Sequence, residues 1–129
     1  MKQALLVLVV VVVTAGTALA ASDHHVNVTL EPVGGSGVSG FVQLTALPNG
    51  STNIHVHATG LTPGVTYSSF EYEASDCTGE FDLLGTFTAN PAGIGNTHVK
   101  LDESLDEIGS VSVRTPDYFT MLFACAVVD

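Results

Sequence analysis

After the first twenty residues, the chain repeatedly alternates apolar and polar side chains with a period of two. Residues 25–32 place Val26, Val28 and Leu30 on one face of an extended segment, and residues 52–59 do the same with Ile54 and Val56. Turn-forming sequences such as GGSG, PNGS, TPG and NPAG separate these segments. Such alternation is typical of strands that have one buried face and one face in water.

The pattern predicts eight strands, at residues 25–32, 37–47, 52–59, 66–73, 84–89, 96–101, 110–114 and 119–128. Short strands at this spacing favour an antiparallel sandwich or barrel. The segment DESLDEIG, residues 102–109, is expected to form one helical turn, capped by Asp102 and ended by Gly109.

The first twenty residues have the organisation of a secretory signal. Lys2 precedes an apolar run over residues 4–13, and Ala18 and Ala20 provide a small-x-small cleavage site. The apolar run is shorter than the roughly 20 residues needed to cross a bilayer. We therefore expect residues 1–20 to be a signal peptide and residues 21–129 to form one secreted or periplasmic domain, with no membrane attachment after cleavage.

The charge of the chain excludes several kinds of partner. Its formal net charge is −10, and cleavage of the signal removes Lys2, one of only three basic residues. Lys100 and Arg114 then remain, and they do not form a basic cluster. So acidic a protein would be repelled by nucleic acids and by anionic membranes.

Cys77 and Cys125 are the only cysteines, and both lie in the exported part. Two cysteines in an oxidising compartment most often form one disulfide. Free thiols and metal-bound thiolates are the alternatives.

Several fragments together resemble the copper/zinc superoxide dismutase family. They are ATGLTPG (58–64), DCTGE (76–80), LGTFTANPAGIG (84–95), VSVRT (111–115) and FACAVV (123–128). The resemblance implies an all-β, eight-stranded Greek-key β-sandwich or barrel, immunoglobulin-like in architecture, with a disulfide between Cys77 and Cys125. A looser resemblance to the chordin-type domain is the second choice.

The ligands that the resemblance implies for copper are replaced in this chain. Glu71, Glu73 and Arg114 stand where that family has histidines, and Leu122 stands where it has an active-site arginine. The zinc-binding loop is reduced to TGEFDLL. Copper that cycles between two oxidation states prefers imidazole ligands, whereas carboxylates are hard donors. We therefore expect no catalytic residues and no cofactor at these positions; copper and zinc would be the cofactors if the chain were a dismutase with an unusual site.

Histidines outside the family positions are candidate surface ligands. His55 and His57 lie two residues apart on one strand and share a face, and His98 also points outward. His24 and His25, near the start of the exported chain, are two further candidates. The alternative interpretation is an ordinary polar outer face.

Acidic residues are concentrated between positions 71 and 82. Glu71, Glu73, Asp76, Glu80 and Asp82 offer oxygen ligands suited to calcium. They do not follow the spacing of a calcium-binding EF-hand loop. We interpret them as an acidic face in contact with solvent.

These observations lead to one functional hypothesis and two alternatives. The first is an exported, non-catalytic superoxide dismutase-like domain that acts as a binding or structural module for an unknown protein or small ligand. The second is a copper/zinc superoxide dismutase with an unusual metal site. The third is copper or zinc sequestration through the surface histidines.

Overall fold

In a computed structural model of the chain, residues 24–117 and 121–129 are described. They form eight strands and one short 3₁₀ turn: β1 (His24–Pro32), β2 (Ser39–Ala46), β3 (Thr52–Thr59), β4 (Thr66–Tyr72), β5 (Phe81–Thr88), β6 (Gly95–Leu101), η1 (Leu105–Glu107), β7 (Ser110–Arg114) and β8 (Leu122–Val127). The all-β prediction is confirmed. The signal peptide predicted at residues 1–20 lies outside the described residues, as do positions 119 and 120 of the last predicted strand.

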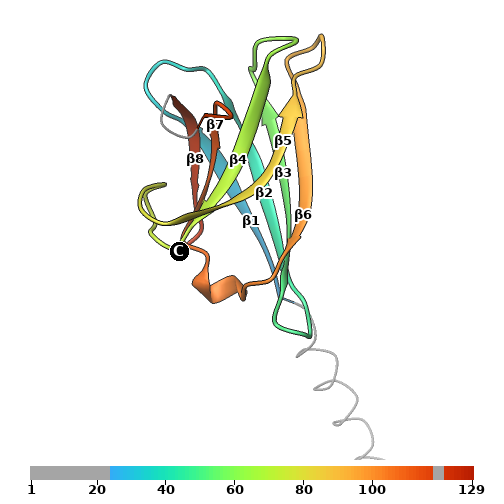
Figure 1. The fold of residues 1–129 in the computed structure, drawn as a ribbon, viewed down its shortest axis with the longest axis vertical. Coiled ribbons are helices and arrows are strands. Elements are labelled where there is room, and N and C mark those ends of the chain that lie inside the picture. Colours follow the sequence, from blue (N-terminus) through green and yellow to red (C-terminus); the bar gives the residue numbers. More distant parts are fainter. Residues whose placement is uncertain (1–23, 118–120) are drawn as a thin grey trace, which may run out of the picture.

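The strands form one antiparallel sheet that curls into a nearly closed barrel (Figure 1). Its hydrogen-bonded order is β5-β4-β7-β8-β1-β2-β3-β6. The two end strands approach each other closely, because a Cβ placed on Gly85 of β5 would lie 2.2 Å from Oγ1 of Thr97 in β6. Across this seam the spatial order β7-β4-β5-β6 is a Greek key, in which three consecutive strands are followed by one that returns beside the first.

The barrel interior is filled by the apolar residues that alternate along the strands. Leu30, Val42, Val56, Val111 and Ala126 come from five different strands, and each is 0% exposed. Burial of a side chain of this kind contributes about 1.5–3 kcal/mol relative to leaving it in water. The period-two pattern therefore identified the inward faces of β1 and β3 correctly.

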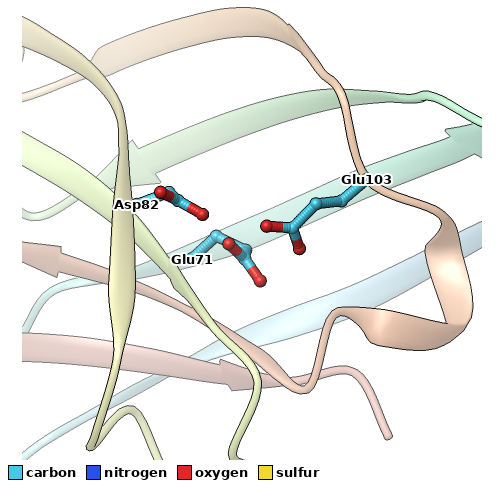
Figure 2. Close-up of side chains that lie close together, drawn as sticks. All are labelled: Glu71, Asp82 and Glu103. Atoms are coloured by element: carbon cyan, nitrogen blue, oxygen red, sulfur yellow. The ribbon is translucent and has the colours of Figure 1, made fainter.

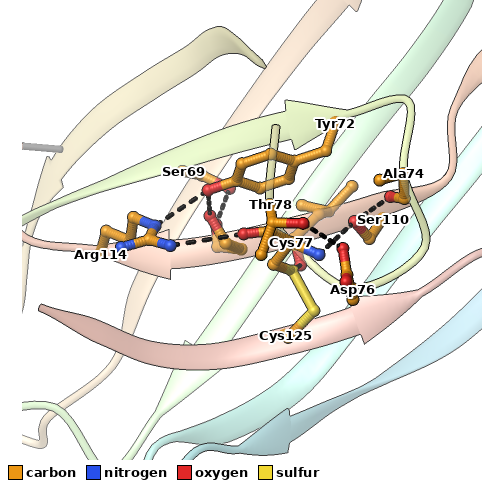
Figure 3. Close-up of a disulfide and its surroundings, with 11 residues drawn as sticks. Ser69, Tyr72, Ala74, Asp76, Cys77, Thr78, Ser110, Arg114 and Cys125 are labelled. Atoms are coloured by element: carbon orange, nitrogen blue, oxygen red, sulfur yellow. Dashed lines mark hydrogen bonds between the residues drawn. A yellow bond between two sulfur atoms is a disulfide. The ribbon is translucent and has the colours of Figure 1, made fainter. Parts of the chain in front are cut away.

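A second, smaller cluster lies on the outer side of the barrel wall. Phe70, Tyr72 and Cys77 are buried there, with Leu122 and Cys125 packed against them. The loop between β4 and β5 covers this cluster, and the disulfide Cys77–Cys125 ties the loop to β8 (Figure 3). The disulfide implied by the family resemblance is thus present.

Polar contacts hold the same loop against β7. The backbone N–H of Cys77 donates to the Ser110 hydroxyl at 2.9 Å, and that hydroxyl donates to the carbonyl of Ala74 at 2.6 Å. Arg114 donates to the Tyr72 hydroxyl through Nε and to the Cys77 carbonyl through a terminal nitrogen, at 2.9 and 3.3 Å (Figure 3). Cys77 has a φ of 59°, a left-handed conformation that only such surrounding contacts make tolerable for a residue with a Cβ.

Two local predictions were wrong. β5 begins at Phe81 rather than at residue 84, because Phe81, Asp82 and Leu83 pair with the end of β4 although all three are exposed. Asp102 does not cap a helix: the 3₁₀ turn begins after Ser104, and the Asp102 carboxylate instead accepts a hydrogen bond from Ser51, at 3.4 Å.

Among residues 24–117 and 121–129, no helix has the length and apolar character required to cross a membrane.

Candidate metal-binding face

Four histidines lie on the outward side of the part of the sheet formed by β1, β2, β3 and β6. One is on β1, two are on β3 and one is on β6. We call this surface the histidine face and define it by His25, His55, His57 and His98. The register explains the grouping, because Gln43 of β2 lies opposite His55 of β3, which in turn lies opposite His98 of β6. Side chains directly opposite each other on neighbouring strands are in contact range.

His55 and His98 have the separation expected of two ligands to one metal ion. Their ring centroids lie 5.6 Å apart, with the ring planes tilted by 46°. Two imidazoles that bind one Zn²⁺ at about 2.0–2.1 Å in tetrahedral geometry place their ring centres about 5–6 Å apart. The separation of the two rings is therefore compatible with two ligands to one ion.

Asn96, on β6, orients two of these imidazoles. Its Oδ1 lies 3.2 Å from Nε2 of His55 and 2.8 Å from Nδ1 of His57. Because an amide oxygen only accepts hydrogen bonds, each of these ring nitrogens carries a proton. The lone pairs of Nδ1 in His55 and of Nε2 in His57 are then available to a metal, which is the arrangement that metal-binding histidines usually have.

A shallow hollow of about 270 Å³ lies next to this pair. It is lined by His25, Gln43, Thr45, Asn53, His55 and His98. Nδ1 of His25 lies 2.8 Å from the Thr45 hydroxyl, which positions a third imidazole at the rim. An ion held by His55 and His98 would thus find amide oxygens, a further histidine and water within the same hollow.

His57 is held differently from its neighbours. Its ring stacks on Phe41 of β2, with centroids 4.9 Å apart and planes inclined by 13°. The outward direction predicted for His55 and His57 is what the structure has, but the close imidazole partner of His55 is His98 rather than His57. Only the pairing of β3 with β6 brings His98 there.

His24 does not belong to the histidine face. It is adjacent to His25 in β1, and successive side chains of a strand point to opposite sides. His24 instead lines a hollow of about 220 Å³ at the barrel end, with Leu105, Ile108 and Asp129 among its neighbours. His24 is therefore an exposed candidate ligand that lies apart from the histidine face.

The residues at the copper positions of the resembled family are not brought to a common point. Glu71 is buried, with 1% of its surface exposed, whereas Glu73 follows the end of β4 and is exposed. Arg114 lies on the outer side of the wall, bonded to Tyr72 and Cys77. The interpretation of the whole 71–82 acidic segment as solvent-exposed was wrong for Glu71.

The fold defines the class of protein as an all-β, eight-stranded antiparallel barrel with one disulfide. No protein-family model matches the sequence, and a search of curated proteins finds no relative.

Proposed function

We propose that the chain is an exported binding module, built on a barrel similar to that of copper/zinc superoxide dismutase, whose histidine face binds a divalent transition-metal ion. The observation that carries the proposal is the cross-strand pair His55–His98, with ring centres 5.6 Å apart. Zn²⁺ and Cu²⁺ are the ions that imidazole ligands suit best. An open site of this kind exchanges its metal readily, as a scavenging or buffering protein requires.

The surroundings of the pair favour a cation. The chain has a formal charge of −10, so its overall field attracts cations. Asn96 fixes the ring orientations of His55 and His57 in advance, which lowers the entropy lost on binding.

The family likeness is supported by shared architecture. The Greek-key order of strands and the disulfide from the loop after β4 to β8 agree with what the sequence fragments imply. Dismutase activity has less support, because Glu71, Glu73 and Arg114 neither supply imidazoles nor share a point in space. We therefore favour binding over catalysis, with metal sequestration as the specific form.

Substitution of either paired histidine is expected to weaken zinc binding. For His55→Gln and His98→Gln we expect an affinity for Zn²⁺ at least 10-fold lower than that of the unaltered protein at pH 7.5, because each removes one of two nitrogen ligands. Isothermal titration calorimetry measures this. His24→Gln is the matched control and should bind as the unaltered protein does. Equal affinity of all three variants would exclude the His55–His98 site.

Asn96→Ala tests the orientation of the rings. Loss of an outer partner of a ligating histidine typically costs 10–100-fold in metal affinity. We expect about a 10-fold loss for this variant, and NMR of the ring nitrogens should show that His55 no longer has one fixed tautomer. Asn27→Ala, on the same outer side in β1, is the control. An unchanged tautomer and affinity in Asn96→Ala would contradict the assigned role.

A further inference from the structure

Three carboxylates from separate segments meet at one end of the barrel. Glu71 is on β4, Asp82 lies opposite it on β5, and Glu103 follows β6 (Figure 2). One oxygen from each lies within 4.8 Å of the others, and among residues 24–117 and 121–129 this is the only set of three or more potential ligands so close together. We call these residues the carboxylate cluster.

Glu71 points into this cluster from a buried position. Phe70 and Tyr72 pack on the outer side of the wall, so Glu71 between them faces the opposite side. Glu71 is 1% exposed, and its Oε2 is buried without a hydrogen-bond partner, as is Oε1 of Glu103. A buried carboxylate oxygen with no partner is costly, and such groups usually bind a metal or a proton.

Basic side chains do not neutralise the cluster. Apart from Lys2, the chain has only Lys100 and Arg114. Lys100 is exposed on the outward side of β6, and Arg114 is bonded to Tyr72 and Cys77 on the outer side of the wall. The charge at the cluster must therefore be compensated by something other than an ion pair.

The acidities of Glu71 and Glu103 reflect their burial first and the neighbouring carboxylates second. Burial, and then the charges of Glu103 and Asp82, raise the pKa of Glu71 to about 8. Burial and the neighbouring Asp82 also raise the pKa of Glu103, and Glu107 adds to this effect. All the charged groups that shift Glu71 are acidic, which is the environment that a bound cation stabilises.

We propose that Glu71, Asp82 and Glu103 form a calcium site at the end of the barrel. Ca²⁺ binds carboxylate oxygens at 2.3–2.6 Å, so two ligands on opposite sides of the ion are up to about 5 Å apart, which accommodates the observed separations. Mg²⁺ requires shorter bonds, near 2.0–2.1 Å, and regular octahedral geometry. Asp82 is exposed and Glu103 half-buried, so water reaches the ion and completes its coordination.

Calcium at this position would join three segments that are distant along the chain. It would link β4 and β5 to the connection between β6 and β7, close to the seam where the barrel is not fully hydrogen-bonded. Since a ligand that binds only the folded state stabilises it, calcium should raise the melting temperature of the protein.

The test is thermal unfolding of the exported, oxidised chain at pH 8 in EDTA, in CaCl₂ and in MgCl₂. We expect CaCl₂ to raise the melting temperature of the unaltered protein by several degrees, and by clearly more than MgCl₂. Glu71→Gln and Glu103→Gln should abolish the rise, and the exposed Glu73→Gln should retain it. Equilibrium dialysis should give one Ca²⁺ per chain.

Three outcomes would overturn the proposal: no rise with calcium, an equal rise with magnesium, or an undiminished rise in both Glu71→Gln and Glu103→Gln. Should Glu71→Gln fail to fold, Glu103→Gln and Asp82→Asn decide the matter. The double variant of His55→Gln and His98→Gln should keep the full calcium response, because imidazole is not a preferred calcium ligand. The calcium and histidine sites can therefore succeed or fail independently.

Discussion

Replacement of Cys77 and Cys125 by serine is expected to lower the free energy of unfolding by about 4 kcal/mol and the melting temperature by about 15–20 °C. The disulfide joins residues 48 positions apart, so its loss releases a large loop in the unfolded chain. It also frees the loop that covers the outer cluster of Phe70 and Tyr72. Differential scanning calorimetry measures the shift.

Chemical reduction provides a control that leaves both sulfur atoms in place. The unaltered protein treated with a reductant should melt close to the double variant, because both lack the same crosslink. The same reductant should not change the melting temperature of the double variant. If reduced and oxidised protein melted alike, the disulfide would contribute nothing to the stability of the barrel.

Glu71→Gln is expected to stabilise the metal-free protein at pH 9 by about 2–4 kcal/mol and to have little effect at pH 4. The folded state raises the pKa of Glu71 from 4.5 to about 8, chiefly through burial and then through Glu103 and Asp82. Folding therefore holds a proton on Glu71 at intermediate pH. The favourable contribution is complete below pH 4.5 and is lost as the pH rises through 8, where a buried charge must form.

Urea unfolding in EDTA at pH 4, 6, 8 and 9 measures this difference between Glu71→Gln and the unaltered protein. The exposed Glu73→Gln is the matched control, and its effect should be small and should not vary with pH across this range. A Glu71→Gln effect that stayed constant from pH 4 to pH 9 would show that Glu71 ionises as it does in the unfolded chain. With calcium present, the alkaline loss of stability in the unaltered protein should be smaller, because the ion compensates the same charges.

The alternation of side chains predicted most of the fold. Val26, Val28 and Leu30, like Ile54 and Val56, were assigned to one face from their spacing, and β1 and β3 have that spacing. Burial of one face imposes a period of two wherever a strand has water on the other side. The start of β5 was predicted three residues too late, because its first three residues join the strand through their pairing with β4 and not through a buried face.

The candidate sites were less predictable, since each depends on which strands become neighbours. His55 and His57 were recognised as an outward pair, but the partner that approaches His55 to 5.6 Å is His98, 43 positions later in the chain. Glu103 reaches Glu71 only because the connection after β6 passes the end of β4. Local periodicity does not record these contacts, which join residues that are distant along the chain.

The sequence by itself determined the all-β class and the inward faces of β1 and β3, because side-chain alternation is a local property. It also indicated the disulfide, because Cys77 and Cys125 are its only cysteines. Only the tertiary structure decided that His98 joins His55, that His24 faces away from both, and that Glu71 is buried among other carboxylates. The physical reason is that strand order and register set these distances. Strand order and register follow from closure of the barrel around its apolar core. The polar residues are then placed by their positions on the strands, and no pattern in their own sequence predicts which of them meet.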